Sequence, residues 1–169
     1  IAIDLGDKRT GLALGDDETG LATPAAVVEV AIAERGGEAL LGALVRAIGE
    51  LVSARAACGL VVGLPVNMDG TEGPRAKSVR AFAARLGAAT GREVFFQDER
   101  LTSAAADWSM SRSGLTRGEK KARRDAMAAA EILKDFLAQR AAARRAAAAG
   151  DASDEAGSGG TEPGGGFAV

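Results

Sequence analysis

Hydrophobic residues recur from residue 1 to residue 140 in runs whose spacing switches between that of strands and that of helices. Short apolar or β-branched runs predict strands at residues 1–5, 10–14, 25–30, 60–64 and 93–97. Apolar residues at helical spacing predict helices at residues 37–57, 73–89, 103–113 and 119–140. Strands that come first as a group and then alternate with helices indicate an α/β fold with a mixed sheet.

Three of these runs indicate how the sheet is built. The first two strands flank the short turn Gly6–Arg9 and therefore predict a hairpin. The run Leu60–Leu64 is apolar throughout and ends at Pro65, which is typical of a central parallel strand covered on both faces.

The composition changes after residue 140. We expect one domain over residues 1–140, followed by a helix extension and an acidic Gly/Ala-rich tail over residues 141–169, disordered from residue 150. The chain has a formal net charge of −2, but its last four acids lie beyond residue 150, so residues 1–145 carry 21 basic and 19 acidic side chains. The expected domain is therefore slightly basic, although the whole chain is not.

Missing residue types restrict the chemistry. The 169 residues include no His, no Tyr and one Cys, which excludes His-based nucleophile systems, His-ligated metals and an internal disulfide. An enzymatic site must then use carboxylates, Lys or Arg, hydroxyls, backbone amides or a hard metal ion bound by oxygen. We find neither a signal-peptide pattern nor an apolar run long enough for a membrane span, and so expect a cytoplasmic protein without a membrane partner.

Three groups of acids lie where solvated carboxylates are not expected. Asp4 lies within an apolar strand, where its carboxylate needs a bonding partner or a metal ion; the alternative is a bond to the adjacent turn. Asp98 and Glu99 follow a strand, at the edge where α/β sheets bind ligands, and strand alternation sends them to opposite faces. The alternative is a helix start, with the acids beside its dipole.

Asp125 is the third of these candidate sites. It lies one turn before the large apolar residues of the last helix and on the same stripe, whereas a solvated acid belongs on the opposite face. A surface pair with Lys121 is the alternative, but it does not explain the position on the stripe. Clustered carboxylates raise one another's pKa unless a cation lies between them, and Mg²⁺ or Mn²⁺ is the natural cation for oxygen ligands.

Two further segments are candidates for phosphate contacts. The loop over residues 63–74 offers backbone amides and a helix N-terminus, although a plain connecting loop explains it equally well. Residues 112–124 hold six basic side chains and one acid directly before Asp125, which suits a nucleic-acid backbone.

Four segments in this order, IDLGDKRTGLA, VVGLPVNMDGTEGPRA, FFQDERLTSAAA and KKARRDAMAAAEIL, resemble the YqgF (RuvX) family over residues 1–140. This family is described both as Holliday junction resolvases and as nucleases that mature the 5′ end of small-subunit ribosomal RNA. The resemblance implies an RNase H-like fold: a five-stranded mixed sheet of order 3-2-1-4-5, with strand 2 antiparallel and helices on both faces.

The resemblance also implies roles for particular residues. The catalytic and metal-binding acids would be Asp4, Glu99 and Asp125, with Asp98 an open alternative for the second. The nucleic-acid contacts would be Arg9, Arg100, Lys120, Lys121, Arg123 and Arg124.

We therefore expect a Mg²⁺- or Mn²⁺-dependent hydrolase of phosphodiester bonds that acts on structured RNA, as in 5′-end processing of pre-16S rRNA during ribosome biogenesis. The alternative is a Holliday junction resolvase that acts on branched DNA as a dimer. A non-catalytic nucleic-acid-binding module is a third hypothesis, which the three acids disfavour because a phosphate binder gains nothing from buried negative charge. Monomer and homodimer both remain open; Cys58 offers the one route to a disulfide-linked dimer, unless it is simply packed.

Overall fold

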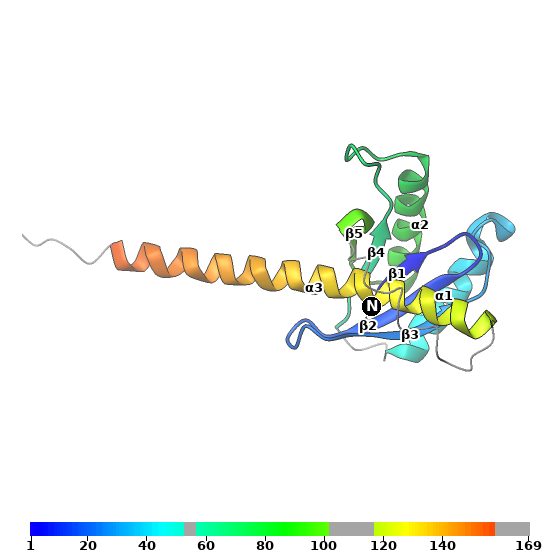
Figure 1. Ribbon diagram of the computed structural model, residues 1–169, viewed down its shortest axis with the longest axis horizontal. Helices are drawn as coiled ribbons and strands as arrows, with labels where there is room; N and C mark the ends of the chain where they lie inside the picture. The colour runs from blue at the N-terminus through cyan, green and yellow to red at the C-terminus, as the bar shows by residue number, and fades with distance from the viewer. Residues whose placement is uncertain (53–56, 102–116, 158–169) are drawn as a thin grey trace, which may run out of the picture.

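The computed structural model describes residues 1–52, 57–101 and 117–157 of the chain (Figure 1). Its centre is a five-stranded sheet in the order β3-β2-β1-β4-β5. The strands are β1 (Ala2–Leu5), β2 (Thr10–Gly15), β3 (Ala22–Val28), β4 (Leu60–Leu64) and β5 (Val94–Asp98). β2 is antiparallel to both of its neighbours, while β4 is parallel to β1 and to β5. The predicted strand order and the antiparallel second strand are confirmed.

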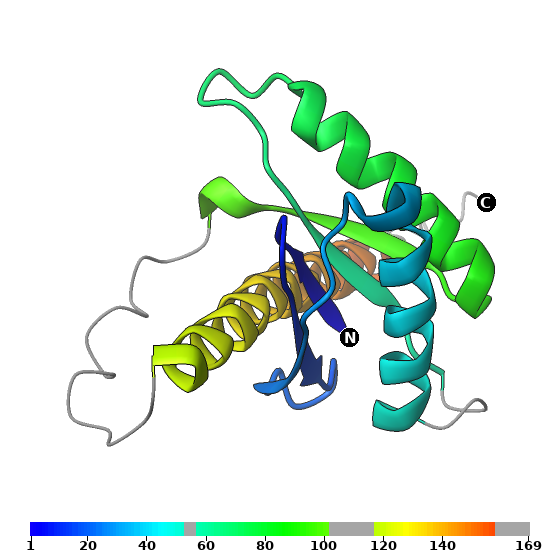
Figure 2. The ribbon, with the colours of Figure 1, turned by 90° about the vertical axis from the view of Figure 1, so that its right-hand side faces the viewer.

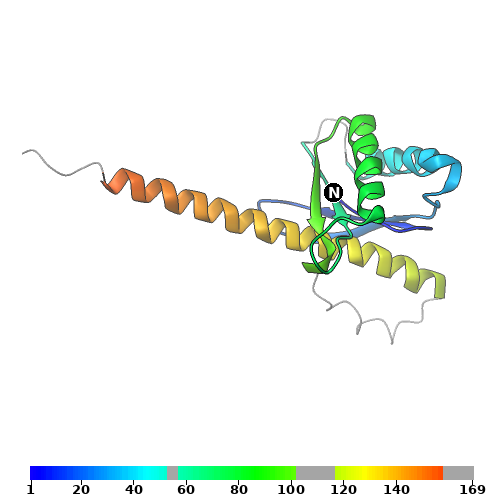
Figure 3. The same ribbon diagram turned by 90° about the horizontal axis from the view of Figure 1, so that it is seen from above.

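Helices cover both faces of the sheet, which gives three layers in the view from above (Figure 3). Helices α1 (Glu38–Leu51) and α2 (Pro74–Thr90) pack on one face, and the long helix α3 (Arg117–Gly157) crosses the other. Two short 3₁₀ helices, η1 (Glu34–Gly37) and η2 (Glu99–Leu101), precede α1 and follow β5. The mixed α/β class with helices on both faces is confirmed.

Strand alternation divides the core into two clusters, one on each face. In β1, Ile3 and Leu5 face α1 and α2, whereas Ala2 belongs to the cluster under α3. The cluster under α3 contains many small residues, and a helix packs closely on a sheet whose side chains are small. Asp4 lies two residues after Ala2 and therefore shares the face that α3 covers.

Helix α1 ends at Leu51, before the expected residue 57, and the backbone of Val52 is extended. Two further differences from the expected elements have physical reasons. β3 begins at Ala22 and contains Pro24, which an edge strand tolerates because one side of it makes no ladder bonds. Helix α3 continues past residue 149 to Gly157, because a single helical glycine costs only about 1 kcal/mol relative to alanine. The expected helix at 103–113 and the tail at 158–169 lie outside the described residues.

A search of the described residues finds no helix that is both long enough and apolar enough to cross a membrane.

Candidate active site

Asp4 occupies the C-terminal end of the central strand β1, on the face covered by α3. It is half-buried, and its cross-strand partner in β2 is Gly11. On the other side of β1, the parallel register pairs Ile3 with Val62, so Asp4 and Gly63 come next on the two strands. A glycine on each neighbouring strand therefore leaves space beside the Asp4 carboxylate.

Gly11 brings the last helix to this space. A Cβ atom at position 11 would overlap the backbone carbonyl oxygen of Asp125, so α3 lies directly on the backbone of β2. Asp125 is half-buried there, and the next apolar residues of α3, Ala129, Ile132 and Leu133, are buried against the sheet. The stripe position predicted for Asp125 thus faces the sheet, next to β1.

Gly63 accommodates the acid that follows β5. A Cβ atom at position 63 would lie 2.5 Å from Glu99 Oε1 and 2.8 Å from Ile132 Cδ1. The Glu99 side chain therefore extends from η2 back over β4, on the same face as Asp4. Glu99 and Asp125 enter the site from opposite sides of β1, each across a glycine.

The electrostatics agree with this placement. Burial raises the pKa of Asp4, and the nearby Asp125 carboxylate raises it further. Burial also raises the pKa of Glu99, with a second contribution from Asp4. Asp4 therefore interacts with both other acids, and a neighbouring carboxylate opposes the ionisation of Asp4 and of Glu99.

Asp98 takes a different position from Glu99. It forms an ion pair with Arg100, whose Nη2 lies 2.6 Å from Asp98 Oδ2, and this pairing lowers the pKa of Asp98. Arg100 Nη1 also donates to the carbonyl oxygens of Asn67 and Met68, each at 3.0 Å. Both residues thus tie η2 to the loop between β4 and α2. Of the two acids, Glu99 is the one directed to Asp4.

Arg9 lies against the third acid. Its Nε donates to Asp125 Oδ2 at 2.8 Å, and its side chain is only 18% exposed. The partner of Asp125 in the described structure is therefore Arg9, from the β1–β2 turn, and not Lys121, which is exposed.

Arg75 is a site residue that the sequence reasoning missed. At the start of α2, its Nη1 lies 2.5 Å from Asp7 Oδ1 and its Nη2 donates to the carbonyl oxygen of Leu5 at 3.1 Å. Its positive charge lowers the pKa of both Asp4 and Glu99. Its position just after Pro74, at a helix start that follows a strand, was the available indication.

The described part of the basic segment before Asp125, residues 117–124, forms the start of α3. Lys121, Arg123 and Arg124 are exposed there, while the side chain of Lys120 lies outside the described residues. In Figure 2, the start of α3, the end of β5 and the β4–α2 loop all lie at the left side of the molecule. The exposed cations therefore share an edge of the sheet with the acids.

The side chains of Asp4, Glu99 and Asp125 are of the type that binds divalent metal ions. They offer oxygen ligands. The pKa values of Asp4 and Glu99 are raised first by burial and then by repulsion from a neighbouring carboxylate, and a cation would relieve this repulsion. As placed in the described part of the chain, no three acidic or cysteine side chains form a complete ligand set. Binding an ion therefore needs side-chain movement, beginning with Arg9, which holds Asp125.

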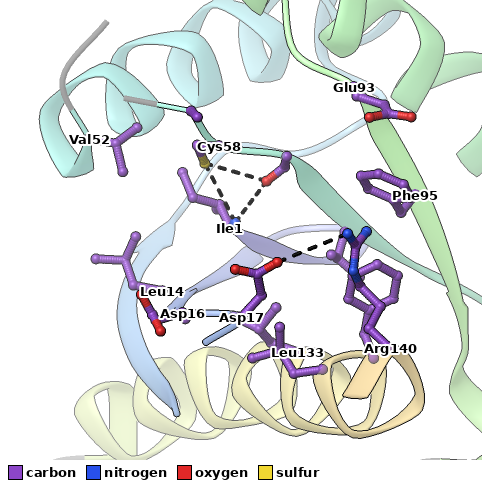
Figure 4. A pocket seen from close by; sticks show the side chains of 16 residues that line it. Ile1, Leu14, Asp16, Asp17, Val52, Cys58, Glu93, Phe95, Leu133 and Arg140 are labelled. Carbon is purple, nitrogen blue, oxygen red and sulfur yellow. Dashed lines mark hydrogen bonds and ion pairs between the residues drawn. The ribbon is translucent and has the colours of Figure 1, made fainter. Parts of the chain in front are cut away.

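A separate cavity lies away from the clustered acids. It encloses about 530 Å³ at the other end of the central strands, and its lining includes Ile1, Asp17, Cys58 and Arg140 (Figure 4). An ion pair between Asp17 and Arg140 crosses it, and the free Cys58 is half-buried at its rim. This cavity contains none of the three clustered acids.

A mixed 3-2-1-4-5 sheet with acids on its first strand, after its last strand and on its final helix defines a protein of the RNase H-like class. Comparison with known proteins identifies the family within this class. The family model described as "RuvX: Holliday junction resolvase" matches residues 1–139, and the chain belongs to this family.

The relatives agree with this assignment. A protein of Ruegeria pomeroyi is 39% identical over 135 residues, which are 80% of this chain and 82% of the relative. Proteins of two Anaeromyxobacter strains, Fw109-5 and K, are 42% and 40% identical; the matches cover 81% and 83% of this chain and 94% and 97% of the relatives. All three relatives are provisionally named pre-16S rRNA nucleases.

Proposed function

We propose that this protein is a divalent-metal-dependent nuclease that hydrolyses phosphodiester bonds of structured RNA in the cytoplasm, in the 5′-end processing of pre-16S rRNA. The observation that carries the proposal is the approach of Glu99 and Asp125 to Asp4 across two glycines, Gly63 and Gly11. The names of the relatives support the choice of RNA as substrate.

Asp4, Glu99 and Asp125 would hold Mg²⁺ or Mn²⁺. When bound, the ion supplies Lewis-acid activation of the phosphodiester and of the attacking water. The burial that raises the pKa of Asp4 and Glu99 also keeps the site in a low-dielectric environment, where their interaction with a cation is strong. This chemistry needs neither His nor Tyr, and the chain has neither.

Cationic side chains would bind the substrate around these acids. Lys121, Arg123 and Arg124 are exposed at the start of α3 and are suited to backbone phosphates; we assign the same role to Lys120. Arg9 is close enough to Asp125 to exchange that carboxylate for a phosphate oxygen when the acid takes up a metal ion. Arg100 acts mainly by holding the β4–α2 loop, because its Nε, Nη1 and Nη2 all donate within the protein. Its role as a phosphate contact would require it to exchange one of these partners for a phosphate oxygen.

The substitution Asp4→Asn tests this proposal. It keeps the size of the side chain and removes one carboxylate charge, so we expect cleavage of a precursor RNA in Mg²⁺ or Mn²⁺ to fall by at least about a hundredfold. Titration calorimetry with Mn²⁺ alone should show weaker binding, which reports on the metal site independently of activity.

Glu50→Gln is the matched control, because Glu50 is an exposed carboxylate on α1, on the opposite face of the sheet. We expect unchanged cleavage and Mn²⁺ binding in this variant. Undiminished cleavage by a folded Asp4→Asn protein would refute the proposed mechanism.

The family description favours a second candidate, a resolvase of four-way DNA junctions. The same acids would serve it, but two sites in a dimer would have to cut two strands. Side-by-side assays of a four-way DNA junction and a precursor RNA, with the oligomeric state measured by light scattering, distinguish the two functions.

A further inference from the structure

Met68 is the most exposed large hydrophobic residue of the described chain. Its side chain is 91% exposed, at the tip of the loop between β4 and α2. Full exposure forgoes the free energy that a methionine gains by burial, so neither the core nor the stability of the fold explains this position.

The loop that carries Met68 is held by its own hydrogen bonds. Asn67 N donates to the carbonyl oxygen of Thr71 at 2.9 Å, and Gly70 N donates to that of Asn67 at 2.8 Å. Asp69 Oδ1 accepts from both the backbone N and the Oγ1 of Thr71, at 2.9 and 2.6 Å. These bonds also use the amides of Asn67, Gly70 and Thr71, which a phosphate cradle would need.

Arg100 fixes the loop relative to the acids. Its Nη1 donates to the Met68 carbonyl oxygen at 3.0 Å, and its other nitrogens hold Asp98. Arg100, which directly follows Glu99 in the chain, therefore links Met68 to the segment that carries Glu99. Loops that follow parallel strands lie at the same edge of a sheet, and Figure 2 shows this loop extending beyond the end of β5.

We propose that Met68 is a substrate-contacting wedge, which packs against a nucleobase where the stacking of the RNA is interrupted next to the cleaved bond. This inference rests on the proposed nuclease function and names the substrate feature that the site recognises. Exposed apolar side chains, methionine among them, enter base steps in nucleic-acid-binding proteins, and the polarisable thioether makes favourable contacts with aromatic rings. A tied loop loses little conformational freedom when it binds.

In this proposal, Met68 and the cations of α3 contact different parts of the RNA. The exposed cations of α3 contact phosphates and give affinity without regard to base stacking, whereas Met68 is uncharged and contacts a base. Substrates with a stem next to an unpaired strand offer both contacts, whereas a continuous duplex hides its base faces. The wedge thus favours the boundary between paired and unpaired RNA.

The experiment uses the full-length chain with Asp4→Asn, which prevents cleavage during binding. The probe is an RNA hairpin with a single-stranded 5′ extension and 2-aminopurine at the first unpaired position. Adding Met68→Ala should raise the Kd about tenfold, which corresponds to about 1.4 kcal/mol. It should also reduce the rise in 2-aminopurine fluorescence that unstacking produces, and leave the salt dependence of Kd unchanged because no charge is removed.

Two matched variants control for loss of apolar surface. Met68→Leu keeps an apolar side chain of similar size and should retain most of the affinity and the fluorescence change. Leu21→Ala removes another exposed hydrophobic residue, 67% exposed, which precedes β3 and lies beyond the far end of β2. It should bind the RNA like the Asp4→Asn parent.

Each result has one meaning. Equal Kd and equal fluorescence change in the parent and in the Met68→Ala protein would overturn the wedge, while the nuclease proposal would stand on the cleavage assay. A parent that fails to bind this RNA would also overturn the wedge, and both proposals would fall if the wild-type chain in addition left the precursor RNA uncleaved. A wild-type chain that binds through Met68 but never cleaves would overturn only the nuclease function.

Discussion

Arg75 supplies the positive charge that opposes repulsion among the clustered carboxyl groups. It lies at the first turn of α2, anchored by Asp7 and by the carbonyl oxygen of Leu5, and it lowers the pKa of both Asp4 and Glu99. Burial and mutual repulsion act in the opposite direction and prevail, since the pKa of each acid is raised overall. Loss of the Arg75 charge should therefore make both Asp4 and Glu99 harder to ionise.

Replacing Arg75 tests this dependence. In Arg75→Gln, the pKa values of Asp4 and Glu99 should rise further, because the charge that lowers them is gone. Acids must ionise to hold a cation, so the acidic limb of a pH profile of kcat/KM should move to higher pH. Arg85→Gln, which removes an arginine paired with Glu38 at the other end of α2, should leave that limb in place. An unmoved limb in Arg75→Gln would contradict the assignment.

At the scale of elements, the decisive contact is that of α3 with β2. Gly11 allows the helix backbone to touch the strand, and Gly15 allows the Leu133 side chain to approach the strand about two turns further along α3. This close packing places Asp125 beside Asp4, so the site depends on the distance between a helix and a strand as much as on the acids themselves.

Gly11→Ala should therefore damage both the fold and the site. A methyl group at this position overlaps the Asp125 carbonyl, and overpacking of this kind costs about 1–3 kcal/mol. We expect a lower free energy of unfolding in urea and weaker Mn²⁺ binding, because α3 must move away from β1. Gly42→Ala is the control, since the space around Gly42 on α1 is open and the change should be neutral or stabilising. Equal effects of the two substitutions would argue against the close contact.

At the scale of the whole molecule, the two parts of α3 differ in their contacts with the sheet and in their charge. Its first part packs across the sheet, and its later part extends beyond the sheet as a single helix (Figure 1). Arg140 and Arg144 bind Asp17 near the point where it leaves the sheet. The four acids beyond residue 150 therefore follow the last ion pair described between α3 and the sheet.

A chain that ends at Ala149 should keep the stability of the full chain, because it retains these ion pairs. It should bind RNA at least as tightly, since removing four acids shifts the formal net charge from −2 to +2. Urea unfolding and RNA binding at two salt concentrations measure both effects. A large loss of stability on truncation would show that the C-terminal segment packs on the domain.

The sequence by itself determined the order of the elements and the types of residue available for chemistry. Alternation and helical spacing are local, so they predicted the five strands, α1, α2 and α3 to within a few residues, apart from the ends of α1 and α3. They also placed Asp125 on the buried stripe of its helix. The absence of His and Tyr had already restricted the chemistry to carboxylates, Lys or Arg, hydroxyls, backbone amides or a metal ion bound by oxygen. The resemblance of four motifs added the strand order.

Only the tertiary structure decided which of these groups meet. Asp98 and Glu99 are neighbours in the chain, yet Glu99 lies over Gly63 toward Asp4 while Asp98 binds Arg100. The pairing of Arg9 with Asp125 and the influence of Arg75 join residues far apart in sequence. Such contacts depend on strand register and on the missing side chains of two glycines, and no local periodicity encodes the distance between a helix and a strand.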